Sequence, residues 1–244
     1  MKQVVFSDLT YKNGLKDGLP IGLGYLPVAF AFGVQASLLG VPILITLFIS
    51  MTNLTSAGQL AGLEIIATLG SFIEIILTQL LINSRYFLMS LSLSQKTDDS
   101  FTLPARLLTS AFITDEIFAV SVAKPKTIGK NYFLGVATLP YVGWTLGTLL
   151  GALAGDILPI IITSALGIAL YSMFIAIIIP PAIKSKGVVM SILLSSAVSC
   201  TFFFVPFLKD NVTQGFAIII SALIGAAITA LFFPLKKEVD NDAQ

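Results

Sequence analysis

Two adjacent acidic residues, Asp115 and Glu116, stand about midway along a long apolar segment, residues 103–122. A carboxylate at that depth in a membrane is costly unless it faces a cavity, pairs with a cation or binds a proton. Neighbouring helix positions point about 100° apart, so the two side chains cannot share one face. We expect one acid to face a substrate or proton path. The alternative is a shallow segment in which both acids reach the interface.

Two further charges, Glu74 and Arg85, lie in or next to apolar runs. Glu74 falls well inside the membrane if residues 63–82 form a span, and it joins Asp115 and Glu116 as a candidate for proton coupling. Arg85 is always charged and its planar fork suits a carboxylate, so we predict that it binds a substrate carboxylate or neutralises Glu74 or Asp115. The alternative for Arg85 is a structural ion pair or a side chain that snorkels to the surface.

Polar and small residues interrupt the apolar runs at two places, residues 53–59 (Asn-Leu-Thr-Ser-Ala-Gly-Gln) and residues 83–86 (Asn-Ser-Arg-Tyr). Lipid cannot satisfy backbone N–H and C=O groups, so a break at this depth must be buried in protein or line a wet cavity. One interpretation of the first break is a surface loop between two short helices. The other is a discontinuous helix, in which Thr55 or Ser56 caps a half-helix whose N-terminus faces a small anionic group.

The residues that we predict to bind substrate lie at these two breaks. They are polar side chains that can hydrogen-bond a ligand, or a glycine that lets a ligand approach the backbone: Asn53, Thr55, Ser56, Gly58, Gln59, Asn83 and Arg85. Polar groups of this kind also join helices to one another in membranes, and that alternative stays open. The aromatic residues Tyr25, Tyr141 and Trp144 are assigned to packing or to the interfacial belt.

The composition places the elements that carry these residues in a lipid bilayer. Of the 244 residues, 56% are hydrophobic and only 11% are charged, and the mean hydropathy is +0.94. The alternating ten-residue segments of a membrane barrel are absent. Since a helix needs about 20 apolar residues to cross a bilayer, we predict an all-α polytopic membrane protein with about 6–8 transmembrane helices, one or two of them discontinuous.

The composition also excludes several function classes. The net charge is +1, so no nucleic-acid partner is expected. The chain has no His and one Cys, which rules out a disulfide within the chain and the usual zinc, haem and Cys–His chemistries. No phosphate-binding Gly-x-x-x-x-Gly-Lys-Ser/Thr pattern occurs, which disfavours a nucleotide-driven pump. We expect no catalytic residue, metal or other cofactor.

The apolar runs predict spans at residues 19–39, 42–62, 63–82, 103–122, 131–154, 159–183, 188–207 and 213–233, with a half-helix or an extension at 87–95. The expected domains are a cytoplasmic N-terminal segment (1–18), a single transmembrane domain (19–234) and a polar cytoplasmic tail (235–244). Lysines cluster in alternate loops of the second half, which puts both termini in the cytoplasm of a multi-pass cell-membrane protein. The number of crossings is therefore even. It is eight if residues 41–62 cross, or six if that segment is re-entrant and another is regrouped.

A weak internal repeat is also visible. Residues 39–46 (Leu-Gly-Val-Pro-Ile-Leu-Ile-Thr) resemble residues 157–163 (Ile-Leu-Pro-Ile-Ile-Ile-Thr), and a Leu-Pro pair precedes each stretch, at Pro27 and at Pro140. Transporters are often built from repeats, with the binding site at the interface between them. Chance similarity is the alternative, because Pro and Ile are common in membrane spans.

The order and spacing of several motifs resemble the AzlC family, the large subunit of branched-chain amino acid exporters of the LIV-E type. The similar stretches are the glycine-rich opening at residues 14–33, the break at residues 55–59, the turn at residues 83–86, and Thr114-Asp115-Glu116, within a resemblance over about residues 10–235. One departure is Tyr86, which stands where the family often has His. Because the chain has no His, a His-based proton relay is excluded.

The resemblance implies a secondary transporter that exports branched-chain or other apolar amino acids such as methionine, coupled to the proton gradient. It also implies a small membrane partner of the AzlD type. Two other classes stay open. One is a non-transporting structural or regulatory subunit of a membrane complex. The other is an intramembrane enzyme, for which Asp115 with Glu74 or Glu116 would supply the pair of carboxylates.

Overall fold

The computed structural model describes residues 9–155 and 157–233, and these form a helical membrane protein. Six of its helices are long and apolar enough to cross a membrane: α1 (Tyr11–Leu38), α4 (Phe72–Ser94), α7 (Lys130–Ala154), α8 (Ile160–Lys184), α9 (Lys186–Phe204) and α11 (Gln214–Phe232). The others are short: α2 (Ile43–Thr52), α3 (Ser56–Ala67), α5 (Leu103–Ser110), α6 (Asp115–Val122) and α10 (Pro206–Asn211). The prediction of an all-α polytopic protein is confirmed, at the lower end of the expected number of spans.

The two ends of the chain fall partly outside the described residues. The predicted tail at residues 235–244 and the first eight residues of the predicted N-terminal segment belong to this part. α1 begins at Tyr11, within the segment that we predicted to precede the membrane domain, and the Thr10 side chain caps it by accepting a hydrogen bond from the Asn13 N–H (3.3 Å). The orientation of the termini across the membrane stays a prediction.

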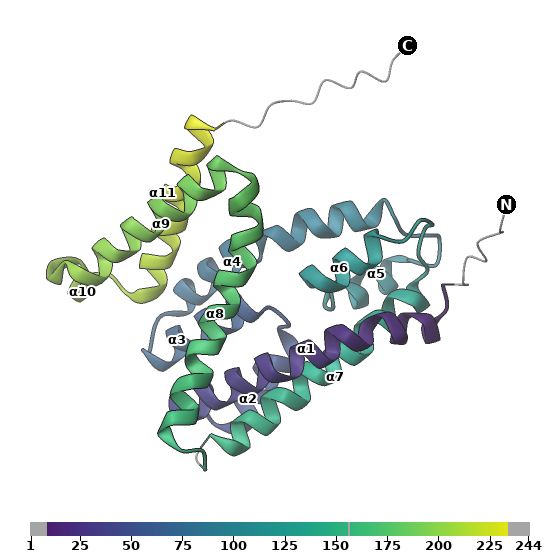
Figure 1. Cartoon of the computed structure of the whole chain (residues 1–244), viewed down its shortest axis with the longest axis horizontal. Coiled ribbons are helices and arrows are strands. Elements are labelled where there is room, and N and C mark those ends of the chain that lie inside the picture. Colours follow the sequence, from purple (N-terminus) through teal and green to yellow (C-terminus); the bar gives the residue numbers. More distant parts are fainter. Residues whose placement is uncertain (1–8, 156, 234–244) are drawn as a thin grey trace.

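α1 and α7 lie side by side along much of their length and form the frame of the molecule (Figure 1). Glycines at every fourth position from Gly14 to Gly22 give α1 a flat strip that rests on the backbone of α7. A side chain at Gly22 would begin 2.7 Å from the carbonyl oxygen of Leu139, so no larger residue fits. The two helices run parallel, because Gly14 packs on the first turns of α7 and Gly33 packs on Thr148 near its end.

Four of the short helices form two hairpins that enter the helix bundle from opposite ends: α2 and α3 form the first hairpin, and α5 and α6 form the second. α2 and α3 start from the end at which α1 stops. α5 and α6 start from the end at which α1 and α7 begin: the loop before α5 is held there by a hydrogen bond from the Asp98 N–H to the Ile128 carbonyl (3.0 Å), and Lys124, just after α6, pairs with Asp17 of α1 (2.8 Å). This arrangement matches the six-crossing alternative, in which the segment at residues 42–62 is re-entrant.

The predicted break at residues 53–59 is the tip of the first hairpin. The Asn53 side-chain oxygen accepts hydrogen bonds from the backbone N–H (3.2 Å) and the hydroxyl (2.7 Å) of Thr55, a local turn that competes with helix. Leu54 at the tip is buried against Tyr25 and Trp144, which lie near the middle of α1 and α7. The tip is therefore deep in the bundle, and the predicted discontinuous helix is confirmed, although neither Thr55 nor Ser56 makes a side-chain capping bond to α3. That the start of α3 faces a small anionic group stays a prediction.

Three expected segments differ from the structure. α4 runs through residues 83–86 without a break, so the interruption expected there is wrong, and of the two alternatives for residues 87–95 the extension is confirmed. The expected span at residues 63–82 is divided by the turn between α3 and α4, where the Ser71 hydroxyl caps α4 by accepting from the Glu74 N–H (3.2 Å). The expected span at residues 103–122 is the second hairpin.

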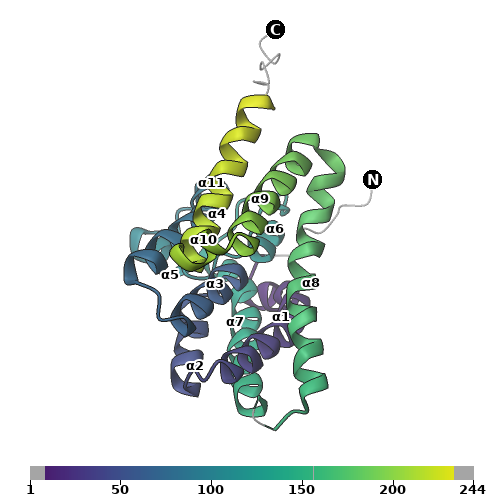
Figure 2. The same cartoon turned by 90° about the vertical axis from the view of Figure 1, so that its left-hand side faces the viewer.

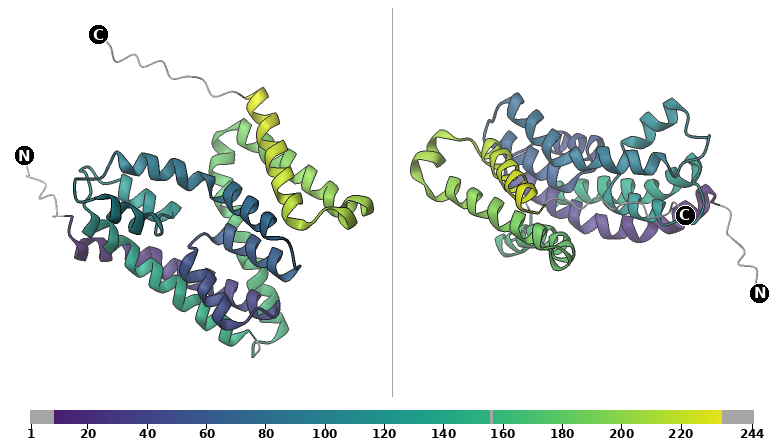
Figure 3. Two further views of the ribbon diagram at one scale, coloured as in Figure 1. Left: turned by 180° about the vertical axis from the view of Figure 1, so that it is seen from behind. Right: turned by 90° about the horizontal axis from the view of Figure 1, so that it is seen from above.

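α8 to α11 complete the chain. α9 and α11 pack closely where Gly225 meets Ser195, and they lie at the opposite end of the molecule from α5 and α6 (Figures 1 and 3). α8 runs from the end of α7 to the start of α9 (Figure 2). The two stretches of the weak internal repeat, residues 39–46 and 157–163, join α1 to α2 and α7 to α8 respectively. Their common origin stays a prediction.

Candidate functional site

A cavity of about 340 Å³ lies where the tips of the two hairpins meet α1 and α7. The first tip contributes Leu54 and Ser56, and the second contributes Thr114, Asp115 and Glu116. A pocket of ~300–1,000 Å³ is the usual size for a small-molecule ligand, so this cavity suits a small one. Two segments that break inside the bundle thus line one cavity.

α1, α4 and α7 supply the remaining walls of the cavity, which are largely apolar. Val28, Tyr25 and Trp144 form one side, and Tyr86 of α4 lies across from them in the lining. Gly24 also lines the cavity, and a Cβ atom built on it would meet no other atom within 4 Å. The cavity therefore reaches the backbone of α1 at this glycine.

The acidic end of the cavity is the N-terminus of α6. Thr114 caps this helix, since its hydroxyl oxygen accepts a hydrogen bond from the Ile117 N–H (3.4 Å). Asp115 and Glu116 occupy the first turn, where the partial positive charge of the helix N-terminus stabilises carboxylates. The three residues from Thr114 to Glu116 thus both start α6 and place two acids at the cavity.

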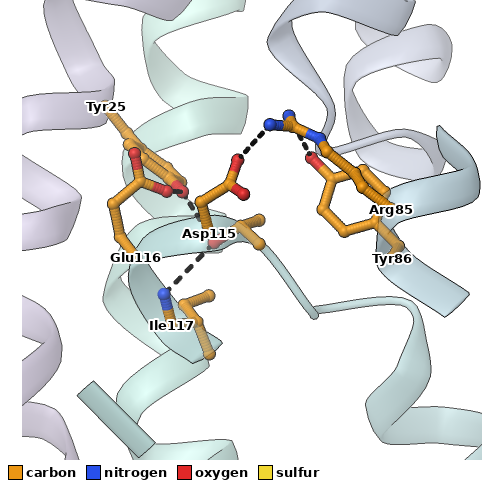
Figure 4. A network of polar contacts seen from close by, with 7 residues as sticks. Tyr25, Arg85, Tyr86, Asp115, Glu116 and Ile117 are labelled. Carbon is orange, nitrogen blue, oxygen red and sulfur yellow. Dashed lines mark hydrogen bonds and ion pairs between the residues drawn. The ribbon is translucent and has the colours of Figure 1, made fainter. Parts of the chain in front are cut away.

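The two acids point in different directions, as their adjacent positions require (Figure 4). Asp115 pairs with Arg85 of α4 at 2.9 Å, and both side chains remain about two-fifths exposed. The Arg85 guanidinium also donates to the Tyr86 hydroxyl (3.1 Å) and lies 5.0 Å from the centre of that ring. Of the predicted partners of Arg85, the structure places Asp115 beside it.

Glu116 points toward α1 instead. The Tyr25 hydroxyl donates to the Glu116 carboxylate and lies 2.7 Å from the Thr114 hydroxyl. The tip of the second hairpin is therefore fastened on one side to α4 through an ion pair and on the other to α1 through a tyrosine (Figure 4).

Most of the predicted substrate-binding residues join helices in this structure. The Gln79 side chain of α4 donates to the carbonyl of Gly58 (2.7 Å) and accepts from Asn83 (3.0 Å) and Asn53 (3.5 Å). Thr55 belongs to the same group through its bond to Asn53. Among the predicted residues of the first break, Ser56 lines the cavity. The roles of the others in binding stay predictions.

Gln59 belongs to a second buried group, which links the first hairpin to α7. Its side chain donates to the Ser50 hydroxyl and accepts from the indole N–H of Trp144 (3.0 Å). The Ser50 hydroxyl lies 2.7 Å from that of Thr148, one turn beyond Trp144 on α7. Gln59 does not itself line the cavity, but it holds the indole ring of Trp144, which does.

Glu74 is not brought together with the other candidate acids. It is 1% exposed and lies in the first turn of α4, at the far end of that helix from the loop that precedes α5. One carboxylate oxygen accepts from the Thr213 hydroxyl (2.6 Å) and from the Gly215 N–H (2.7 Å), so Glu74 caps α11. The predicted pairing of Glu74 with Arg85 is not formed, because Arg85 pairs with Asp115.

Sequence reasoning missed nine of the residues that line the cavity, and four of these carry an aromatic ring or a hydroxyl group. Tyr25 and Trp144 were assigned to packing or to the interfacial belt, and Thr114 and Tyr86 were noted only as parts of motifs. A signal for Thr114 was present, because a threonine followed by two acids is typical of a helix start. Within the described part of the chain, no group of three or more acidic or cysteine side chains is placed to hold a metal ion.

Comparison with known proteins places the chain among membrane proteins. The family model described as "AzlC protein" matches residues 20–158. The inner membrane protein YgaZ of Escherichia coli (strain K12) is 29% identical over 206 residues, which cover 81% of this chain and 84% of that protein. An uncharacterized membrane protein of Archaeoglobus fulgidus is 32% identical over 173 residues, 70% of this chain and 75% of that protein.

No solved structure gives a significant match to the chain. The family match includes both hairpins and every residue that lines the cavity, from Pro20 to Trp144. Since it also covers more than half of the chain, the protein belongs to the AzlC family.

Proposed function

We propose that the protein is a secondary transporter that exports branched-chain or other apolar amino acids, and that these bind in the cavity between the two hairpin tips. The observation that carries the proposal is the pairing of two broken segments from opposite ends of the bundle around one space with an acidic side and an apolar side. Discontinuous helices that meet in this way are typical of transporter binding sites.

The polar groups of the cavity suit the two charges of an amino acid. The substrate ammonium group is assigned to the side formed by Asp115 and Glu116. The substrate carboxylate is assigned to the start of α3, where Ser56 lines the cavity and Thr55 makes no side-chain capping bond to the helix. Uncapped N–H groups at a helix start carry a partial positive charge that favours an anion.

The apolar wall suits the side chain of the substrate. Val28, Leu54 and Trp144 offer it a dry surface next to the charged groups. Burying a Leu-sized side chain contributes ~1.5–3 kcal/mol to binding. The site should therefore bind large apolar amino acids about one to two orders of magnitude more tightly than glycine. This difference supports large apolar amino acids as the substrate class.

Proton coupling and a partner subunit are further parts of the proposal. Asp115 and Glu116 are the assigned proton-coupling groups, because both line the cavity and each is bonded there to a side chain of another helix. Glu74, which does not line the cavity, stays a third candidate for proton coupling. A small AzlD-type membrane subunit is expected on the strength of the family resemblance, so the chain should be tested together with it.

Gly24 offers a direct test of the cavity. Gly24→Leu would place a side chain in open space and fill the cavity without a clash, while raising helix propensity. We expect leucine efflux from cells loaded with a leucine-containing dipeptide to fall about tenfold or more, because a ligand whose burial is worth ~1.5–3 kcal/mol is displaced.

The matched control is Gly167→Leu on α8. A Cβ at Gly167 lies 4.0 Å from the end of the flexible Gln35 side chain, and Gly167 does not line the cavity. Both variants should reach the membrane at the level of the unmodified protein. Normal efflux by Gly24→Leu would remove the cavity from the proposal. If the unmodified protein gave no more efflux than cells that lack it, the exporter function itself would be removed.

A further inference from the structure

Trp144 occupies an unusual position for a membrane aromatic residue. It lies near the middle of α7 and not at an end, it is only 2% exposed, and it lines the cavity. Interfacial tryptophans stand at the ends of spans, where the ring meets the headgroups. The position of Trp144 therefore calls for an explanation inside the bundle.

One edge of the indole is held by the first hairpin. The indole N–H donates to the Gln59 side-chain oxygen (3.0 Å), and the other end of the same amide donates to the Ser50 hydroxyl. Ser50 is tied in turn to Thr148 (2.7 Å). Trp144 and Thr148 lie one turn apart on α7, so the Gln59 amide is held at both ends. It cannot rotate without losing its hydrogen bond to the indole or to Ser50.

The other side of the indole rests on α1. The rings of Tyr25 and Trp144 meet edge to face, with centres 5.1 Å apart and planes inclined at 67°. Tyr25 is itself fixed by its hydroxyl, which bonds to Glu116 and lies next to Thr114 (Figure 4). The indole is thus clamped between two side chains that are each held from a different hairpin.

A wall held in this way does not adapt to its ligand. A ring that is free to turn makes room for a larger side chain, whereas a ring clamped on both sides excludes it by overlap. Rigid pockets separate substrates by size in steps of roughly 10–200-fold per methylene group. The fixed indole faces a cavity of about 340 Å³ that must also hold the charged groups of a substrate.

We infer that Trp144 sets the upper size limit of the substrate side chain, admitting aliphatic amino acids and excluding aromatic ones, and that Gln59 is the positioning residue that keeps the indole in place. This inference rests on the proposed function and adds a specificity-determining residue to it. The ligand classes that it separates are aliphatic and aromatic amino acids, with leucine and phenylalanine as probes.

The first measurement uses the protein as it stands. Trp144 is the only tryptophan of the chain, so its emission reports directly on the wall of the cavity. With the purified protein in lipid nanodiscs, leucine should change the emission. Phenylalanine should do so only at concentrations about tenfold higher or more. An equal response to both amino acids at equal concentrations would overturn the size limit.

The second measurement changes the wall. In Trp144→Leu the ratio of phenylalanine efflux to leucine efflux should rise about tenfold or more. Phe133→Leu is the matched control, since Phe133 is a fully buried ring on the same helix that does not line the cavity. An unchanged ratio in Trp144→Leu, with leucine efflux retained, overturns the inference and leaves the proposed function standing.

Gln59→Met tests the positioning role, because it keeps the side-chain length and removes the bond to the indole. We expect the efflux ratio to rise by a smaller factor and the Trp144 emission to become easier to quench with acrylamide. An equal loss of both substrates with unchanged quenching would make Gln59 merely structural. If Trp144→Leu does not reach the membrane, Trp144→Phe decides, and an unchanged ratio there also overturns the inference. Absence of any efflux by the unmodified protein would instead remove the proposed function.

Discussion

The two hairpins reach the same cavity but are held in different ways. α3 of the first hairpin is largely buried, and neutral hydrogen bonds from Gln79 and Trp144 fasten its tip to α4 and α7. α5 of the second hairpin has one buried residue, Thr109, and cavities of about 270 and 430 Å³ flank it. Its tip is held by the half-exposed ion pair of Arg85 with Asp115 and by the tyrosine contact to Glu116.

This difference indicates that the first hairpin is the more rigid of the two and that the second moves more easily. Elements with few buried contacts and solvent-accessible ties open first, because they have the lowest local stability. Under the proposed function, the charges of the second tip are also the groups that would contact the ammonium group of the substrate and carry the proton. We therefore expect the first hairpin to act as a fixed wall and the second as the part that responds to substrate and protons.

The largest expected effect lies in the second hairpin. Asp115→Asn and Glu116→Gln keep the shape of each side chain and remove its charge, so neither can release a proton. Gradient-driven leucine efflux should fall to the level of cells without the protein, while gradient-independent exchange of leucine persists. Asp99→Asn, in the exposed loop before α5, is the control and should behave normally. Normal gradient-driven efflux by both cavity variants would remove the acids from the mechanism.

The next effect concerns the first hairpin. A Cβ at Gly58 would come within 2.7 Å of Gln79 and 3.3 Å of Asn83, so Gly58→Val forces apart the contact with α4. Overpacking of this kind costs ~1–3 kcal/mol, which should appear as a lower unfolding temperature and less protein in the membrane. Gly24→Leu, which meets open space, should show neither change. If Gly58→Val is stable yet binds no leucine, this glycine faces the ligand and the first tip is not merely a wall.

The smallest effect is expected at the ion pair that ties the second hairpin to α4. Arg85→Lys keeps the charge but loses the planar fork that reaches Asp115 and Tyr86 together. Because the pair is half-exposed, stability should change by less than ~1 kcal/mol, whereas leucine efflux should fall severalfold. Thermal unfolding and leucine efflux, measured on the same preparation, distinguish a loss of stability from a loss of transport. Efflux that matches the unmodified protein would show that a point charge is sufficient at this position.

Five of the six spans of the described chain (α1, α7, α8, α9 and α11) and the first break were predictable because the bilayer imposes them. Lipid requires long apolar helices, and it requires any irregular backbone to be buried, so residues 53–59 signalled a site of some kind. The acids at Asp115 and Glu116 stood out for the same reason. These signals are local in the sequence and do not depend on the tertiary arrangement.

The remaining features depend on partners that are distant in the sequence. Residues 83–86 lie inside the continuous helix α4, and Arg85 there pairs with Asp115 at the tip of the second hairpin. The turn before α4 has Leu69 in the left-handed region (φ 56°) inside an apolar run, which hydropathy cannot detect. The Ser-x-x-Glu pattern at Ser71 and Glu74 did mark that turn. Trp144 does pack in the core, as predicted, but its place in the cavity lining was missed, because a sequence does not show which way a helix faces.

The close contact between α1 and α7 has a consequence for the order in which the protein folds during synthesis. α1 is synthesised first, but the backbone that its glycines fit belongs to α7, more than a hundred residues later. Until α7 is inserted, α1 has no matching surface and the two hairpins have no frame on which to close. Assembly is therefore expected to wait for the second half of the chain, and contacts of such long range slow folding. Release of nascent chains before residue 154 should leave proteins that insert in the membrane and are then degraded.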